Sequence, residues 1–301
     1  LAMTAAGSEI ETRTSDLTLS SELLLSAGSI TSTGGNLSFA DGLTVSGEGT
    51  MSVLDSTLSV SQNLDFISAS FESSVLDLQG ATTLTSNGPV SFKKVNLNGN
   101  VLTLGSAATH FVLTGPNETL NLDNLALETG AGSLTIAGAL KLQNGAELNS
   151  SGGTITLESE NSDYFVESGS LFSIPDTALI TNNYLTFSGS TLKAKNTTFT
   201  TNGFSLALDT GSILEVEGTQ NITGLHLDDS STLRLAADTE LENDNWMSIG
   251  TLELANFALT LGDTMSKLTV TQPVTLDAAT EQIISGDADV SLNGGITVSN
   301  G

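Results

Sequence analysis

Two short stretches of this sequence hold the side chains best suited to chemistry. In the first, His226 is followed closely by Asp228 and Asp229 within GLHLDDS. An imidazole near two carboxylates is a candidate for acid–base work, for metal binding or for hydrogen bonding to a polar ligand. The alternative is a solvent-facing strand histidine followed by a polar turn. The other histidine, His110, stands in ATHFVL without a carboxylate nearby in the sequence.

The second stretch, residues 238–247 (DTELENDNWM), combines acidic side chains with the single tryptophan of the chain. Glu240, Glu242 and Asp244 form a candidate calcium site, because calcium prefers carboxylate oxygens. The stretch does not resemble an EF-hand loop, and a solvated acidic loop is the alternative interpretation. Trp246 is a candidate platform for a sugar ring, although a lone tryptophan also serves as a packing residue.

Neither stretch predicts an enzyme. Paired aspartates resemble those of β-helical polysaccharide-cleaving enzymes, but such families add basic residues around the carboxylates. The nearest basic residue here is Arg234, within TLRL. We therefore assign no catalytic residue and expect a non-enzymatic protein, with four candidate ligand-binding residues: His226, Asp228, Asp229 and Trp246.

The elements that position these residues are predicted by alternating apolar residues. In VSFKKVNLNGNVLTL, residues 90–104, apolar side chains occupy every second position, and Lys, Asn and Gly separate short runs. Period-two alternation is typical of a β-strand with one buried face, and Asn and Gly favour tight turns.

Equivalent apolar positions recur along the chain at intervals of about 18 to 22 residues. One such series is Leu17, Leu37, Leu58, Leu76 and Val95. This spacing predicts an all-β fold with almost no helix: a parallel β-helix, or β-solenoid, of about 15 coils. The competing fold is a pair of antiparallel β-sandwiches, because Asn98-Gly99, Asn202-Gly203 and Asn293-Gly294 are hairpin signals.

The domain organisation expected from this pattern is simple. Residues 1–16 are an N-terminal extension or cap, and residues 17–301 are one solenoid domain, which a longer chain could continue. Residues 158–175 and 238–247 interrupt the alternation and are expected to be loops. The final stretch, GGITVSNG, is similar to an interior coil, which favours either further coils or end-to-end association with another subunit.

Charge and composition limit the classes of partner that we expect for this protein. With 34 acidic and 8 basic side chains, the formal net charge is −26. Such a surface repels nucleic acids and anionic lipid headgroups, so we expect neither partner. Cysteine is absent, which excludes disulfides and thiolate chemistry. We also expect no insertion into a membrane, because no run of about 18 apolar residues occurs.

Stretches such as NLNGNVLTLGS, GSLTIAGALKLQNGAEL and TFTTNGFSLALDTGSILEVEG resemble secreted β-helix repeats. The similar families are bacterial autotransporter passengers and filamentous-haemagglutinin-like adhesins. The resemblance implies an extracellular or cell-surface stalk, adhesin or fibre subunit with a glycan or protein receptor. A carbohydrate-binding or carbohydrate-cleaving β-helix protein is the alternative.

Overall fold

A computed structural model describes residues 1–299 except 68, 72, 162, 210, 223, 244–245 and 263–266. Within these residues the chain contains no helix and forms a parallel β-solenoid of about 14 turns. The predicted fold class is therefore confirmed, and the expected number of coils is close to the observed one.

The chain divides into two compact units. The N-terminal unit contains Leu1–Leu120 and Leu125–Ala139, and the C-terminal unit contains Asn121–Asn124 and Leu140–Gly301. Strand β18 (Thr119–Asp123) lies at the boundary between them in the sequence.

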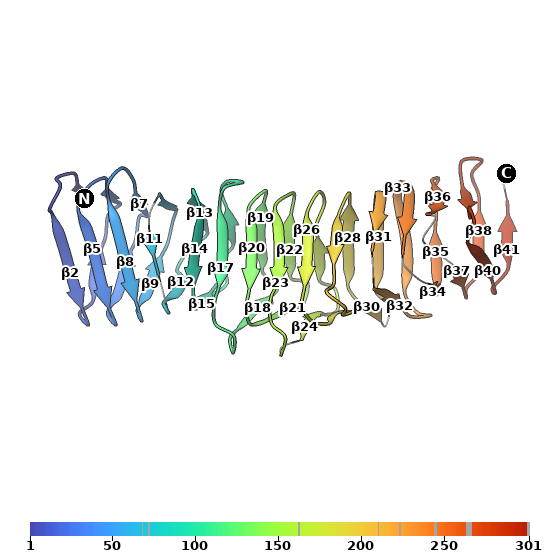
Figure 1. The fold of residues 1–301 in the computed structure, drawn as a ribbon, viewed down its shortest axis with the longest axis horizontal. Helices are drawn as coiled ribbons and strands as arrows, with labels where there is room; N and C mark the ends of the chain where they lie inside the picture. The colour runs from blue at the N-terminus through green and yellow to red at the C-terminus, as the bar shows by residue number, and fades with distance from the viewer. Residues whose placement is uncertain are drawn as a thin grey trace. The chain divides into compact units, whose positions relative to one another are not determined.

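In the N-terminal unit each turn contributes up to three strands, and equivalent strands of successive turns pair in parallel, as β2, β5 and β8 do in Figure 1. The first series is β1 (Ala2–Met3), β4 (Leu23–Leu25), β7 (Leu43–Val45), β10 (Leu64–Phe66), β13 (Thr82–Ser86), β16 (Leu102–Leu104) and β19 (Ala126–Gly130). The second is β2 (Glu9–Arg13), β5 (Ser29–Thr33), β8 (Thr50–Leu54) and β11 (Ala69–Ser70), then β14 (Pro89–Phe92), β17 (His110–Leu113) and β20 (Ser133–Ile136). The third is β3 (Leu17–Leu19), β6 (Asn36–Phe39), β9 (Thr57–Val60), β12 (Val75–Leu78) and β15 (Lys94–Asn96).

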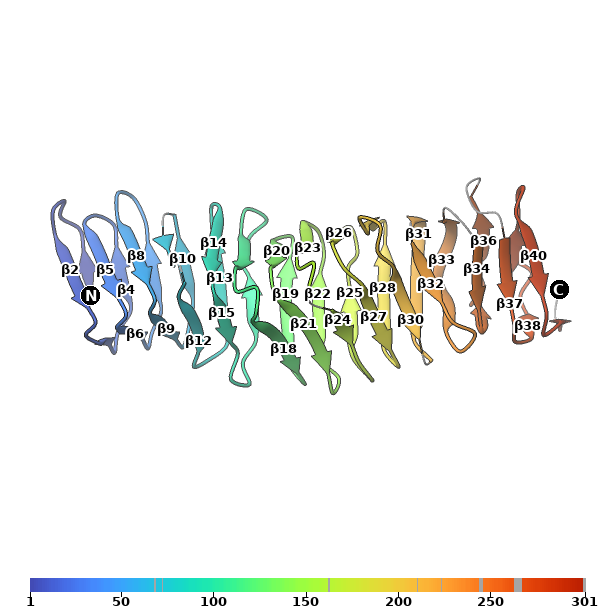
Figure 2. The same cartoon turned by 60° about the horizontal axis from the view of Figure 1, so that its bottom comes forward.

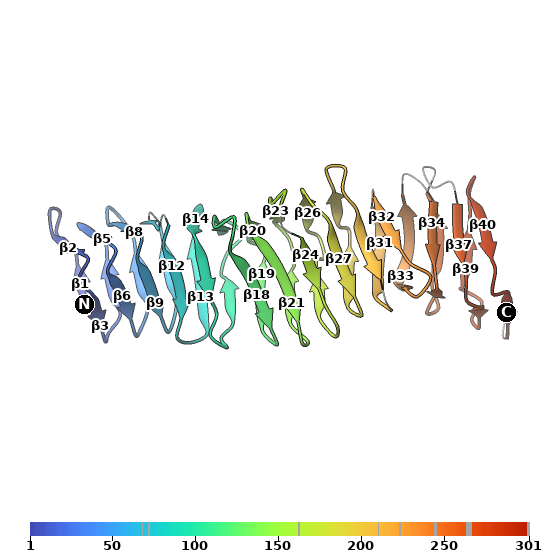
Figure 3. The ribbon, with the colours of Figure 1, turned by 90° about the horizontal axis from the view of Figure 1, so that it is seen from below.

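The C-terminal unit repeats this arrangement, with β24, β27 and β30 as successive neighbours (Figure 2). The first series is β22 (Glu147–Ser150), β25 (Leu171–Ser173), β28 (Thr191–Lys195), β31 (Ile213–Asn221), β33 (Thr232–Glu242), β35 (Thr251–Glu253), β38 (Val274–Leu276) and β41 (Ile296–Val298). The second is β23 (Thr154–Leu157), β26 (Ala178–Thr181), β29 (Thr198–Thr200), β36 (Ala258–Leu261) and β39 (Gln282–Ile284), joined by the second halves of β31 and β33. The third is β21 (Ala139–Gln143), β24 (Tyr164–Val166), β27 (Leu185–Ser188), β30 (Leu206–Asp209) and β32 (Leu225–Leu227), followed by β34 (Trp246–Ile249), β37 (Lys267–Val270) and β40 (Asp289–Leu292). Figure 3 shows β37 and β40 side by side, as their register requires.

The core consists of in-register columns of apolar side chains. Leu23, Leu43, Leu64 and Leu84 occupy paired positions on four successive turns, and each is at most 1% exposed. Burying one such side chain contributes roughly 1.5–3 kcal/mol. A turn has too few apolar residues to enclose a core alone, so each turn depends on the turns before and after it.

Asparagines form the corners between strands. Asn98 has a φ of +50°, and its Nδ2 donates a hydrogen bond of 2.9 Å to Oδ1 of Asp77, one turn earlier. Asparagine tolerates this left-handed conformation better than most residues. The same bond across one turn joins Asn144 to Asp123, Asn196 to Asp176 and Asn202 to Asn182. The Asn-Gly dipeptides, which would form hairpins in the competing β-sandwich fold, instead form corners between consecutive strands of different sheets. Each of those strands pairs in parallel with a strand of an adjacent turn.

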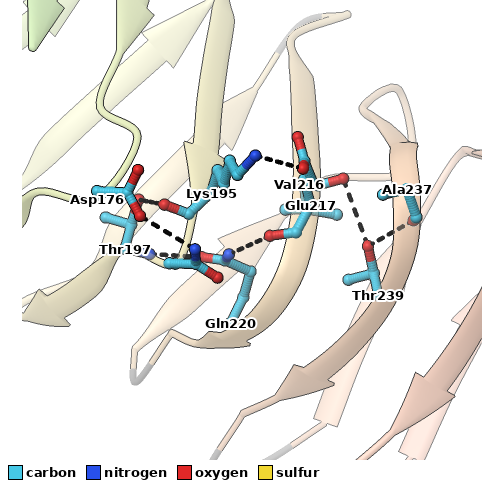
Figure 4. A network of polar contacts seen from close by, with 9 residues as sticks. Asp176, Lys195, Thr197, Val216, Glu217, Gln220, Ala237 and Thr239 are labelled. Carbon is cyan, nitrogen blue, oxygen red and sulfur yellow. Dashed lines mark hydrogen bonds and ion pairs between the residues drawn. The ribbon is translucent and has the colours of Figure 1, made fainter. Parts of the chain in front are cut away.

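Buried polar side chains bind backbone carbonyls as well, and Figure 4 shows this for Thr197, Gln220 and Thr239. The Oγ1 of Thr197 donates to the carbonyl of Ile174 at 2.6 Å, while the Gln220 Nε2 donates to the carbonyl of Glu217 at 2.7 Å. These bonds satisfy backbone groups that the change of strand direction removes from the ladder.

The structure corrects the two expected loops to different extents. Residues 158–175 are irregular over most of their length but contain the short strands β24 and β25, from which Tyr164 and Phe172 point into the core. In residues 238–247, β33 extends to Glu242 and β34 begins at Trp246. Residues 1–16, expected as an extension or cap, contain β1 and β2, which pair with β4 and β5; a capping role for them stays a prediction.

Candidate functional site

His226 faces outward from the middle of β32. Its neighbours Leu225 and Leu227 point into the core, while the histidine side chain is exposed. The other histidine, His110, lies in the N-terminal unit with its Nε2 2.8 Å from Oγ1 of Thr135. His226 lies in the C-terminal unit and His110 in the N-terminal unit, so neither unit contains both histidines.

The two aspartates after β32 have different surroundings. The Asp228 Oδ1 accepts hydrogen bonds from the hydroxyls of Ser230 and Ser231 at 2.7 and 2.9 Å, which closes the turn after the strand. The Asp229 Oδ1 accepts a 2.7 Å bond from the hydroxyl of Ser248 on β34, in the next turn. Asp228 thus stabilises a turn, whereas Asp229 holds a side chain of the neighbouring strand.

A surface depression of about 270 Å³ brings His226 and Trp246 together. Trp246 opens β34, and its side chain is 54% exposed. Ser248 also lines the depression, so Asp229 reaches it through the Ser248 hydroxyl, whereas Asp228 does not line it. Two of the four predicted ligand-binding residues therefore share one hollow, and a third orients a hydroxyl in it.

The predicted calcium residues lie mostly on a strand. Glu240 and Glu242 project outward from β33, and Glu242 Oε2 accepts a 2.9 Å bond from Nδ2 of Asn221 on β31. Asp244 lies outside the described residues. Among the residues that the structure describes, no group of three or more His, Asp or Glu side chains is arranged to hold a metal ion.

Two exposed aromatic side chains on earlier turns of the same strand series were missed by sequence reasoning. Tyr184, directly before β27, is 52% exposed, and Phe165, the middle residue of β24, is 40% exposed. The Tyr184 ring packs edge-on against Phe204 with a centroid distance of 5.6 Å. The available signal was their position between inward-facing residues, which predicts an outward ring.

Tyr164 lies on the inner side of the same sheet and is fully buried. Its hydroxyl accepts a 2.6 Å hydrogen bond from the backbone N–H of Ser159. Burial raises the pKa of Tyr164 to about 12, and the Ser159 bond partly opposes that rise.

Charged side chains form a ladder on another face of the C-terminal unit. We call Lys193, Glu215, Arg234 and Glu253 the charge ladder, since they occupy in-register positions on β28, β31, β33 and β35. Lys193 Nζ lies 3.1 Å from Glu215 Oε1, and Arg234 lies 3.8 Å from Glu215 and 2.6 Å from Glu253. The hydrogen bond to Glu253 is the main cause of a raised pKa at Arg234.

A second ion pair, between Lys195 and Glu217, lies two residues further along β28 and β31. Figure 4 shows this ion pair, whose Lys195 Nζ and Glu217 Oε1 atoms lie 2.6 Å apart. The hydrogen bond between them raises the pKa of Lys195. Each charged side chain of the ladder, and of this neighbouring pair, lies close to one of opposite charge.

Comparison with protein-family models, curated proteins and solved structures gives no match for this chain. What is shown is therefore a β-solenoid of stacked parallel coils, and the likeness to autotransporter passengers and adhesins stays a resemblance in the repeat pattern. In the described part of the chain, no helix has the length and apolar character needed to cross a membrane.

Proposed function

We propose that this chain is a non-enzymatic, extracellular or cell-surface structural protein that serves as an adhesive stalk or fibre subunit. The observation that carries the proposal is the in-register stacking of apolar columns through successive turns. Tyr164, Leu185, Leu206 and Leu225 form such a column in the C-terminal unit, and each is at most 6% exposed. A fold of this kind gains length by adding turns, which is what a spacer or fibre requires.

The outer surface supports the same role. Corner asparagines and cross-strand ion pairs join several successive turns in addition to the backbone ladder. A net charge of −26 keeps such a surface soluble and repels polyanions.

The last described turn offers a place where stacking can continue. Strands β39, β40 and β41 each pair with a preceding strand on one side, and their outer edges have no partner among the described residues. Ile296 and Val298 on β41 are 52% and 60% exposed. A following turn would cover them, whether it belongs to a second copy or to the same chain.

End-to-end association is tested by light scattering and negative-stain electron microscopy over a wide concentration range, with and without millimolar calcium. We expect mass to increase with concentration, and calcium to promote association by screening the acidic ends. Val298→Lys should weaken association, whereas Ile67→Lys, at a residue of similar exposure in the N-terminal unit, should not. A wild-type chain that stays monomeric at every concentration would contradict the fibre role.

The surface location is tested separately on cells of the source organism. Antibodies raised against the chain should label intact cells, because a stalk or fibre must reach the exterior. Labelling that requires permeabilisation of the cells would exclude this location.

The non-enzymatic assignment is tested by incubating the chain with neutral polysaccharides and measuring new reducing ends. We expect none, since Asp228 closes a turn and Asp229 holds a serine hydroxyl. Release of reducing ends that His226→Ala abolishes would instead establish carbohydrate cleavage.

A further inference from the structure

The most exposed aromatic side chains in the described part of the chain belong to one strand series of the C-terminal unit. Three have large exposed surfaces: Phe165, Tyr184 and Trp246, at 40%, 52% and 54%. Phe165 lies in β24, Tyr184 directly before β27 and Trp246 at the start of β34, and these strands belong to one series. Burying these rings would be favourable, so their collection on one face needs a reason other than folding.

Two of the rings end a row of small residues. The backbone carbonyl of Ser205 accepts from Leu185 N–H, and that of Gly224 accepts from Leu206 N–H, at 3.3 and 3.1 Å. Tyr184, Ser205 and Gly224 therefore occupy equivalent places on successive turns, and Trp246 opens β34, the next strand of the series. We call these four residues the aromatic row. At about 4.8 Å per turn, the backbone at Tyr184 and the backbone at Trp246, three turns later, are roughly 14 Å apart.

The middle of the row is kept free of side chains by its backbone. Gly224 has a φ of +74°, and a Cβ there would lie 2.8 Å from the carbonyl oxygen of Phe204. Glycine alone adopts this conformation without strain. The depression beside Gly224 therefore stays open as far as Trp246, which lines it, whereas Tyr184 lies outside the lining. Phe204 packs edge-on against the Tyr184 ring.

Polar groups complete the depression. Its lining includes the exposed His226 ring, the Ser205 hydroxyl and the Ser248 hydroxyl. Because Ser248 donates its proton to Asp229, its oxygen lone pairs remain available to accept a hydrogen bond. Small-molecule sites typically combine apolar walls with a few polar groups placed in this way.

The charge of the depression identifies the class of ligand. Among the residues that the structure describes, the nine that line it include no Asp, Glu, Lys or Arg, although the chain carries a net charge of −26. An anionic ligand would be repelled by the surroundings, and a cationic one would find no carboxylate among these nine side chains. A neutral sugar matches, because its C–H face stacks on an aromatic ring while its hydroxyl groups exchange hydrogen bonds with the polar lining.

We infer that the aromatic row and its depression, from Tyr184 to Trp246, form a binding site for a neutral oligosaccharide that spans both rings. This inference goes beyond the structural role, and it holds whether or not the chain associates end to end. It also identifies a glycan, rather than a protein, as the receptor of the adhesive surface.

The single tryptophan makes the site directly observable. Titration with cellohexaose, maltohexaose and the neutral hexamer of N-acetylglucosamine should produce a saturable change in Trp246 fluorescence for at least one sugar. Hexagalacturonate, an anionic sugar of the same length, should cause no such change. The inference is overturned if no neutral hexamer binds, or if the anionic one binds as tightly.

Variants then locate the binding. Calorimetry should show at least tenfold weaker binding for Tyr184→Ala and for Trp246→Ala, with Tyr184→Phe close to wild type. Ile67→Ala, an exposed residue of the N-terminal unit, is the control and should leave affinity unchanged. Circular dichroism verifies that each variant is folded. Unchanged sugar affinity in folded Tyr184→Ala and Trp246→Ala proteins would place the binding elsewhere and refute the site.

Discussion

Two outward faces of the C-terminal unit use the same backbone for different purposes. The charge ladder and the aromatic row both consist of outward positions on successive turns. In the ladder, acidic and basic side chains alternate, and each contacts a neighbour within 3.8 Å. In the aromatic row, two exposed rings are separated by Ser205 and Gly224, which are too small to cover them.

The difference is also visible in the hollows of the two faces. A depression of about 140 Å³ at the ladder is lined by charged residues, including Lys193, Lys195, Glu215 and Glu217, which already pair with one another. The depression at the aromatic row is about 270 Å³, and none of its described lining residues is charged. A face whose side chains satisfy one another stabilises the stack, whereas a face that leaves rings exposed is suited to a ligand.

The largest effect expected from this comparison concerns the inward and outward side chains of β24. Tyr164→Ala should cost about 3–5 kcal/mol, because it empties a fully buried position. Phe165→Ala, one residue later but outward, should change stability by about 0.5 kcal/mol or less. Guanidinium unfolding followed by circular dichroism measures both. Equal losses would show that the outward rings are structural and would remove the distinction between the faces.

A smaller effect is expected at high pH. Burial raises the Tyr164 pKa from 10.0 to about 12, so the folded state favours the neutral phenol. This contribution is fully present below pH 10 and is lost as the pH rises through about 12, which corresponds to on the order of 2 kcal/mol. Unfolding at a series of alkaline pH values should show this decline in the wild type. Tyr164→Phe should be less stable at neutral pH, because Ser159 N–H loses its acceptor, but should lack that part of the alkaline decline.

The smallest effect tests the charge ladder. Glu215→Lys places three cations in register and should cost about 1–2 kcal/mol, decreasing with added salt. Glu240→Lys makes the same charge change on β33, where the in-register neighbours are Thr219 and Thr260. This control should change stability by about 0.5 kcal/mol or less. If both variants lose the same stability at low and high salt, the ladder does not act through its ion pairs.

The fold was largely predictable from the sequence, because the spacing of the inward-facing apolar residues indicates it. Alternate apolar positions indicate short strands, and a period of about 20 residues indicates stacking of turns. Residues 238–247 were misread as a loop, although Thr239 and Leu241 alternate inward with outward Glu240 and Glu242. The many acidic residues in this stretch obscured the alternation of inward and outward side chains, which the burial of Thr239 and Leu241 shows.

The candidate site was only partly predictable. His226 and Trp246 were selected for their chemistry, and the structure places both in one depression. Ser205 and Gly224, which line the same depression, and Tyr184, on an earlier turn, were missed, because nothing in their local sequence relates them to Trp246. Asp228 was grouped with Asp229, but hydrogen bonds to Ser230 and Ser231 commit it to a turn.

The sequence by itself determined that short strands would stack as parallel turns, because apolar side chains at alternate positions must be buried and one turn cannot bury its own. Only the tertiary structure decided which outward residues of different turns become neighbours. Inward side chains form in-register columns, and β31 shifts register against β33 between Val216 and Gly218. The charge ladder and the aromatic row therefore appear only when the turns are stacked.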